Sequence, residues 1–304
     1  MWLLVLGGTA FVGHAIVQAA LSRGWSVTTF NRRRTGLDPA GVSAIRGDRD
    51  SADDVSRLAA SERWDAVIDC SGYVPRNVLP SRASWRLLPV GTSSCRRSGV
   101  YADWPVRPLT EHSDVLACPP DAGPDYGEDV EDGPTRYGYQ KAGCEAAARL
   151  AFGDDRLAVL RPGVILGPRE YIGRLPWWLR RVAAGGRIVA PGSPDRSIQP
   201  VDVGDVADFA LQCASQPNNG AFNVAAPMGR DSFGALLGAC TAATGALGPE
   251  FVRISDEELL RAGVRQWSEM PLWRTFDGVW RVNASRALGA GLVSRPLAEM
   301  VRDT

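Results

Sequence analysis

The chain has 304 residues, of which 45% are hydrophobic, and 34 basic residues offset 34 acidic ones, so its formal net charge is zero. This length and apolar content can build a sizeable core, either as one large α/β domain or as one with a smaller lobe, while zero net charge argues against a surface dedicated to nucleic acid. Two histidines and six cysteines without a Cys-x-x-Cys pair predict no metal site and reduced thiols, and no apolar run reaches the roughly 20 residues of a membrane span.

The N-terminal residues follow the order strand, glycine turn, helix, strand. Residues 2–6 form a short apolar run typical of a buried parallel strand, and the turn Gly7-Gly8-Thr9-Ala10-Phe11-Val12-Gly13 follows at once. Residues 15–21 then predict a helix, and residues 26–30 a second apolar strand. In this context the glycines indicate a dinucleotide site, because a tight turn would present the free N–H groups of the helix to a pyrophosphate. The alternative is a glycine turn that only connects the two elements.

The residues after the second strand bear on the choice of cofactor. An acidic side chain there favours the free ribose 2′-hydroxyl of NAD, whereas arginine favours the 2′-phosphate of NADP. This chain has Asn31-Arg32-Arg33-Arg34 and no acid at that point, so we predict NADP in preference to NAD. A solvated basic turn is the alternative, because nearly every basic residue of the chain is an arginine.

Two more apolar strands follow, and then the pattern fails. Residues 42–46 predict a third strand that leads into Gly47-Asp48-Arg49, and residues 66–69 a fourth that leads into Cys70-Ser71-Gly72. The next strand should lie within residues 85–99, but Pro89 and two adjacent arginines are poorly suited to a central strand. One hypothesis is that residues 79–97 are an out-of-frame stretch. One set of codons that encodes residues 91–97 would, when read two bases further on, encode an apolar strand that ends in serines. A genuine loop or edge segment is the alternative.

Tyr137 and Lys141 form the clearest catalytic candidate. Lys141 is the single lysine of the chain, and it follows Tyr137 by four residues, so a helix would place both on one face. An ammonium there would stabilise tyrosinate, lower the pKa of Tyr137 and fit that phenol for proton transfer at a carbonyl or carbinol carbon. An ordinary surface Tyr–Lys pair is the alternative. The preceding residues 103–136 are rich in proline, glycine and acids and predict a long loop over the site.

Together these motifs resemble the short-chain dehydrogenase/reductase superfamily in its extended or atypical branch, the NAD-dependent epimerase/dehydratase family. Residues 160–168 and 199–207 resemble later landmarks of that family. The resemblance implies an α/β fold, a Rossmann doubly wound parallel sheet of strand order 3-2-1-4-5-6 with a smaller C-terminal substrate lobe. We expect residues 1–167 to form the NAD(P)-binding Rossmann domain and residues 168–304 mainly the substrate lobe, with about 197–215 returning to the Rossmann sheet.

The resemblance also implies roles for individual residues. Tyr137 would be the general acid/base, Lys141 would hold the nicotinamide ribose hydroxyls, and Ser98 would replace a catalytic serine whose position falls on Arg97. Asp48 would approach the adenine, and Ala10, which stands where a middle glycine is usual, would crowd the phosphates. The expected cofactor-binding residues are Gly7, Thr9, Ala10, Phe11, Val12, Gly13, Asn31, Arg32, Asp48, Arg49, Cys70, Ser71, Gly72, Lys141 and Pro162.

The expected function is hydride transfer on a carbonyl or carbinol of a small molecule. The family spans reduction, epimerisation and dehydration, and the substrate would be a nucleotide sugar or a secondary metabolite. The alternative is a non-catalytic dinucleotide-binding regulator or RNA-binding protein of the same fold. Trp177 and Trp178 would serve core packing, a homodimer contact or the pocket. Because the first strand begins at Trp2, leaving no room for a signal peptide, we expect a cytoplasmic protein.

Overall fold

A computed structural model describes residues 1–61, 63–78, 88–92, 99–216 and 218–304. Its main sheet has seven parallel strands in the order β11-β6-β5-β4-β1-β2-β3, which contains the predicted order 3-2-1-4-5-6 and adds one strand at the edge. The strands of this sheet are β1 (Trp2–Leu6), β2 (Ser26–Asn31), β3 (Ser43–Arg46), β4 (Ala66–Asp69), β5 (Leu88–Thr92), β6 (Ala158–Pro162) and β11 (Gly220–Val224). The predicted Rossmann fold is therefore confirmed.

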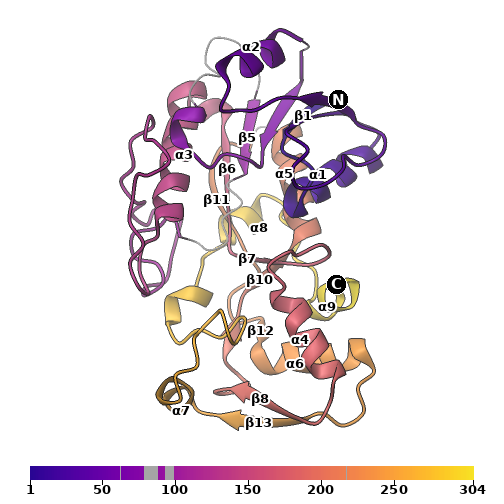
Figure 1. Ribbon diagram of the computed structural model, residues 1–304, viewed down its shortest axis with the longest axis vertical. Helices are drawn as coiled ribbons and strands as arrows, with labels where there is room; N and C mark the ends of the chain where they lie inside the picture. The colour runs from indigo at the N-terminus through magenta and orange to yellow at the C-terminus, as the bar shows by residue number, and fades with distance from the viewer. Residues whose placement is uncertain (62, 79–87, 93–98, 217) are drawn as a thin grey trace.

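Helices cover both faces of this sheet. Figure 1 shows α1 (Phe11–Ser22) and α5 (Val203–Ser215) on one side and α3 (Arg136–Phe152) on the other. Because side chains alternate along a strand, Leu3 and Val5 pack with α1 and α5, whereas Leu4 and Leu6 pack with α2 (Ala52–Ser61). All four leucine and valine side chains are buried, which explains why the first strand reads as a continuous apolar run.

The strand that the sequence pattern does not predict is present. Leu88–Thr92 form β5, which pairs with β4 on one side and with β6 on the other, and Pro89 lies opposite Val67. The backbone of this segment is therefore a central strand of the sheet, and the prediction that the segment is poorly suited to that position is wrong. The remainder of the proposed out-of-frame stretch, including residues 79–87 and 93–97, lies outside the described residues.

The C-terminal part builds a second layer of elements below the main sheet (Figure 1). Its helices are α4 (Arg174–Ala183), α6 (Phe233–Thr244), α7 (Asp256–Arg261) and α9 (Leu297–Asp303), whereas α8 (Ser285–Gly289) packs against β11 of the main sheet. Its strand pairs are β7 (Val164–Leu166) with β10 (Pro200–Asp202), β9 (Ser197–Ile198) with β12 (Asp231–Ser232), and β8 (Arg187–Pro191) with β13 (Glu250–Ile254). Short 3-10 turns lie at Pro75–Asn77, Asp154–Arg156 and Asp277–Trp280.

The return to the main sheet differs in detail from the expectation. Residues 197–202 pair with β12 and β7 and not with the seven-stranded sheet, whereas α5 packs against α1 and β11 forms the sheet's outer strand. The paired tryptophans serve the core of the C-terminal part. Trp178 is fully buried and donates from Nε1 to the Pro271 carbonyl at 2.8 Å, while Trp177 packs edge-on against it with ring centroids 4.7 Å apart.

Candidate functional site

The glycine turn between β1 and α1 forms a cradle at the N-terminus of the helix. Gly7 and Gly8 have φ angles of +104° and +96°, which only glycine adopts without strain. Ala10 caps the helix in an extended conformation without a side-chain hydrogen bond, so the N–H groups of the first helical turn lack helical acceptors. A methyl group on Gly13 would lie 2.8 Å from the Gly8 nitrogen, and its absence lets helix and turn pack closely.

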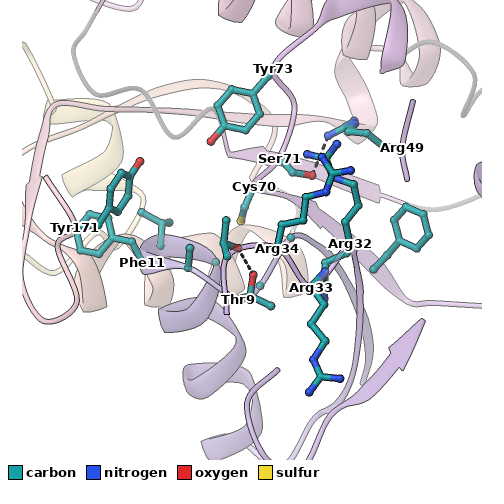
Figure 2. A pocket seen from close by; sticks show the side chains of 18 of the residues that line it. Thr9, Phe11, Arg32, Arg33, Arg34, Arg49, Cys70, Ser71, Tyr73 and Tyr171 are labelled. Carbon is teal, nitrogen blue, oxygen red and sulfur yellow. Dashed lines mark hydrogen bonds between the residues drawn. The ribbon is translucent and has the colours of Figure 1, made fainter. Parts of the chain in front are cut away.

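A cavity of about 300 Å³ opens beside this cradle (Figure 2). Its walls come from the glycine turn, the ends of β2 and β4, and the segment after β7. The lining residues are Gly7, Gly8, Thr9, Ala10, Phe11, Val12, Gly13, Phe30, Asn31, Arg32, Arg33, Arg34, Thr35, Gly47, Arg49, Asp50, Cys70, Ser71, Tyr73, Val74, Asn77, Ile165, Tyr171, Ile172 and Arg174. Eleven of the fifteen predicted cofactor-binding residues are among them, and Asp48, Gly72, Lys141 and Pro162 are not.

Three successive arginines give one end of the cavity a basic wall. Figure 2 shows Arg32, Arg33 and Arg34 projecting from the segment that follows β2. Arg32 donates from Nη1 to an Asp48 carboxylate oxygen at 3.2 Å, so Asp48 is engaged with that arginine. Thr35 and Thr9 share a hydrogen bond of 2.6 Å between their hydroxyls, which ties the arginine segment to the glycine turn.

A partly buried ion pair anchors the turn after β4. Arg49 reaches both carboxylate oxygens of Asp69, at 2.9 and 2.8 Å, and donates to the Ser71 hydroxyl at 3.0 Å. Burial by itself would raise the pKa of Asp69, but the charge and hydrogen bonds of Arg49, the Ser71 N–H and the Lys141 charge together lower that pKa below its ordinary value. The pair therefore stays ionised at neutral pH and fixes the backbone of the Cys70–Ser71 turn at the cavity wall.

The structure brings Tyr137 and Lys141 together in the first turns of α3. Thr135 caps this helix by accepting from the Gly138 N–H at 3.1 Å, and Lys141 is 1% exposed. The Lys141 Nζ donates to the Gly72 carbonyl at 2.5 Å and lies 5.4 Å from the centre of the Tyr137 ring. Neither residue is among those that line the cavity, whereas Tyr73 is, and its ring centre lies 4.2 Å from the Lys141 Nζ.

A buried polar network holds α3 to the sheet behind this pair. Arg161 of β6 forms a bidentate pair with Glu145 of α3, with contacts of 3.1 and 2.7 Å, and donates to the Tyr101 hydroxyl at 3.0 Å. Tyr101 in turn donates to Asn223 of β11 at 2.6 Å, and burial raises the pKa of Tyr101 to about 12. These contacts fix the angle at which α3 presents its first turns.

Several wall residues carry no sequence signal of their own. Tyr73, Tyr171 and Arg174 reach the cavity, and Tyr171 packs edge-on against Phe11 with ring centroids 6.3 Å apart. Arg174 is 3% exposed and pairs with Glu170 at 2.6 Å. None of the three is among the predicted site residues, although Arg174 belongs to a group of arginines that could bind an anionic substrate near a pocket, with a surface position as the alternative. Ser98, the proposed substitute serine, lies outside the described residues.

Two further observations concern metal-ligating groups and long apolar helices among the described residues. No group of three or more histidine, cysteine, aspartate or glutamate side chains there is placed to hold a metal ion. In that same part of the chain, no helix has both the length and the apolar character to cross a membrane.

The fold and the glycine cradle define a Rossmann-type α/β protein. Residues 3–92 match the model of the NAD dependent epimerase/dehydratase family, the family that the motifs resemble. A curated relative, the chloroplast stem-loop binding protein of 41 kDa b from Arabidopsis thaliana, is 27% identical over 275 residues, which are 84% of this chain and 66% of the relative. The chain therefore matches slightly less than two thirds of that protein's length.

Solved structures share the fold over the whole chain. The UDP-glucose 4-epimerase of Thermus thermophilus in complex with NAD is 21% identical, with a TM-score of 0.65 over 100% of this chain and 97% of the epimerase. The UDP-glucose 4-epimerase of Thermotoga maritima with UDP-glucose is 16% identical, with a TM-score of 0.68 over 100% and 97%. The dTDP-glucose 4,6-dehydratase of Bacillus anthracis in complex with NAD is 12% identical, with a TM-score of 0.71 over 100% and 95%.

Proposed function

We propose that the protein is an NAD(P)-dependent oxidoreductase, epimerase or dehydratase that acts by hydride transfer on a carbonyl or carbinol carbon, with NADP as the preferred cofactor. The observation that carries the proposal is the joining of a glycine cradle, a helix N-terminus and three arginines in one cavity of about 300 Å³. A nucleotide sugar or a secondary metabolite would be the substrate, since the related epimerases and dehydratase act on nucleotide sugars.

The residues present fit a dinucleotide. The turn at Gly7 and Gly8 leaves its inner wall open, and the first turn of α1 offers unpaired N–H groups and the positive end of the helix dipole to a diphosphate. Ala10 is exposed at the mouth of this cradle, where its methyl group would narrow the approach of the diphosphate. A bound nicotinamide dinucleotide would supply the hydride acceptor or donor.

Tyr137 would transfer the proton, and Lys141 would support that transfer. The phenol of Tyr137 would take a proton from, or return it to, the substrate oxygen while the hydride moves at the adjacent carbon. Lys141 is held by the Gly72 carbonyl near the Tyr137 ring, so its charge would favour the deprotonated phenol, and the family resemblance implies that its ammonium would bind ribose hydroxyls. Replacing Tyr137 with Phe should abolish turnover and spare cofactor binding.

The preference for NADP rests on the charges after β2. Asn31 ends that strand at the position where an acidic side chain would hydrogen-bond a free ribose 2′-hydroxyl. Arg33 and Arg34 form no ion pair with any described acidic residue. Guanidinium groups bind phosphate through paired N–H donors, so a ribose 2′-phosphate would suit this wall better than a hydroxyl.

A fluorescence titration with NADPH and with NADH tests the proposal. The Arg34→Gln variant should weaken NADPH binding by about tenfold, the loss of one charge-assisted contact, and change NADH binding less than about threefold. Arg187→Gln is the matched control, because the Arg187 side chain is 75% exposed on β8, in the C-terminal part. Equal losses for both nucleotides would refute the 2′-phosphate assignment, and no binding of either nucleotide would refute the cofactor.

The second candidate function is RNA binding without catalysis, which the stem-loop binding relative favours. An RNA-binding protein would bind a stem-loop RNA with an affinity that falls steeply as salt rises, and it would show no turnover on any carbonyl substrate. If the Tyr137→Phe variant bound such an RNA as tightly as the parent chain, and the parent turned over no substrate, RNA binding would replace the enzyme proposal.

A further inference from the structure

A hydrogen-bond network joins the ends of β2 and β3 to the loop between them. Asp38 comes from that loop, Asn31 ends β2, and Arg46 ends β3 opposite Asn31. The Asp38 Oδ1 accepts from the Asn31 amide at 2.7 Å and from the Thr29 hydroxyl at 2.8 Å, and Arg46 pairs with Oδ2. The Asp38 side chain is 11% exposed and is not among those that line the cavity. An acid therefore lies beside the end of β2 in space, although none follows that strand directly in the sequence.

The amide oxygen of Asn31 is fully engaged within the protein. It accepts from the Arg33 N–H at 2.8 Å and from Arg46 Nη1 at 2.7 Å, which uses both of its lone pairs. The amide nitrogen donates to Asp38 and makes a longer contact of 3.4 Å with the Thr29 hydroxyl. Recognition of a free ribose 2′-hydroxyl would require an acceptor at this position. The Asn31 side chain instead binds the backbone of the next turn, although the residue lines the cavity.

The turn that Asn31 holds carries the arginines of the basic wall. Arg33 has a φ angle of +55°, in the left-handed region that residues other than glycine seldom adopt. The Asn31 oxygen holds the start of this turn, and the bond between the Thr35 and Thr9 hydroxyls holds its end. Figure 2 shows the Arg33 and Arg34 side chains leaving the turn in different directions. Because the backbone sets both directions, loss of the Asn31 contact would redirect both guanidinium groups.

We propose that Asn31 and Asp38 are positioning residues that set the preference for the ribose 2′-phosphate, a proposal that rests on the proposed function for its ligand. Asp38 and Arg46 orient the Asn31 amide, and the amide oxygen then holds Arg33 in its left-handed conformation. The turn in this way presents guanidinium donors to a phosphate, while the Asn31 oxygen is not offered to a free hydroxyl. Asp38 acts through Asn31 and does not contact the nucleotide.

Fluorescence titrations with NADPH and NADH test the choice of nucleotide. Asp38→Ala should weaken NADPH binding by about tenfold and NADH binding by less than about threefold, because the arginine turn loses its support while the glycine cradle keeps its own. Asn31→Ala should show the same selective loss. It leaves Asp38 paired with Arg46, so it decides the matter if Asp38→Ala does not fold.

A double variant and a control separate this role from a general loss of structure. If Asp38 acts only through Asn31, the variant that carries both alanines should bind NADPH no more weakly than Asn31→Ala alone. Asp208→Ala is the matched control, because Asp208 pairs with Arg23 at 3.0 Å and neither residue lines the cavity. It should bind both nucleotides like the parent chain.

Limited digestion with trypsin reports the support of the turn without any nucleotide. Trypsin cleaves after arginine, and residues 32–34 are three successive arginines. Cleavage within this segment should be about fivefold faster in Asp38→Ala than in the parent, because the loss of a hydrogen bond favours local opening of the turn. Asp208→Ala should be cleaved there at the parent rate.

The outcomes separate the support of the turn from the cofactor. Equal losses of affinity for NADPH and NADH would overturn the positioning role, since a purely structural defect affects both nucleotides. Losses that add in the double variant would overturn the relay from Asp38 to Asn31, and parent-like cleavage of a folded Asp38→Ala variant would overturn the support of the turn. If the parent binds neither nucleotide while Asp38→Ala is cleaved faster, the support of the turn stands and the proposed function fails.

Discussion

The close contact between Gly13 and the glycine turn predicts opposite effects for two glycine-to-alanine changes. Gly13 lies in the first turn of α1 and Gly238 in the middle of α6, and both helices have 12 residues. A helical glycine replaced by alanine gains up to about 1 kcal/mol of stability, so this favourable contribution is similar in the two variants. A new methyl group meets nothing within 4 Å at Gly238, but at Gly13 it would lie 2.8 Å from the Gly8 nitrogen.

The difference in unfolding free energy between the two variants therefore measures the cost of the clash between the new methyl group and Gly8. Overpacking costs about 1–3 kcal/mol, so Gly13→Ala should unfold with a free energy lower than that of Gly238→Ala by about that amount. Thermal melts followed by circular dichroism should place Gly238→Ala a few degrees above the parent and Gly13→Ala at or below it. NADPH titration should show weaker binding for Gly13→Ala alone, because relief of the clash moves the cradle. Equal melting temperatures and equal NADPH affinities for the two variants would refute this reasoning.

Three further predictions follow from buried or paired groups. Glu145→Gln leaves the Arg161 charge buried without its partner, so denaturant titration should show a loss of about 3–5 kcal/mol, and a loss under 1 kcal/mol would contradict a buried pair. The hydrogen bond from Arg46 lowers the pKa of Asp38 to about 2, so Asp38→Asn should lower stability above about pH 4, and the deficit should vanish as the pH falls through 2. Burial raises the pKa of Cys144 to about 12, so iodoacetamide at pH 8 should leave this thiol unmodified until the chain unfolds.

Most strands of the main sheet were predictable because each carries a local sequence pattern of its own. Strands β1, β2 and β4 are short, buried, apolar runs that end at turns, and the family pattern supplied their order. Strand β5 was missed because its sequence contains Pro89 and Gly91, both unfavourable in isolated strands. Its conformation is determined instead by pairing with β4 and β6 on its two sides, and such non-local pairing leaves no pattern in one segment.

The parts of the candidate site that are continuous in sequence were predictable. The side chains that come together only through the fold were not. The glycine turn and the arginine segment are each continuous in sequence, and both line the cavity. Tyr73 and Tyr171 lie far apart in the chain and reach the same cavity only through the fold, so no spacing rule could select them. Asp48 was predicted to approach the adenine, whereas in the structure it does not line the cavity and pairs with Arg32.

The charges around the cavity also lead to a salt dependence that the composition alone would not suggest. The net charge of the chain is zero, yet Asp48 and Asp69 each pair with one arginine, while Arg33 and Arg34 form no ion pair with a described acidic residue. A local excess of positive charge therefore remains at the mouth of the cavity, where solvent ions screen it over about 10 Å at 0.1 M salt. NADPH carries the additional 2′-phosphate, so raising sodium chloride from 0.05 to 0.5 M should weaken NADPH binding more than NADH binding. Equal salt dependence for the two nucleotides would mean that the phosphate lies away from these arginines.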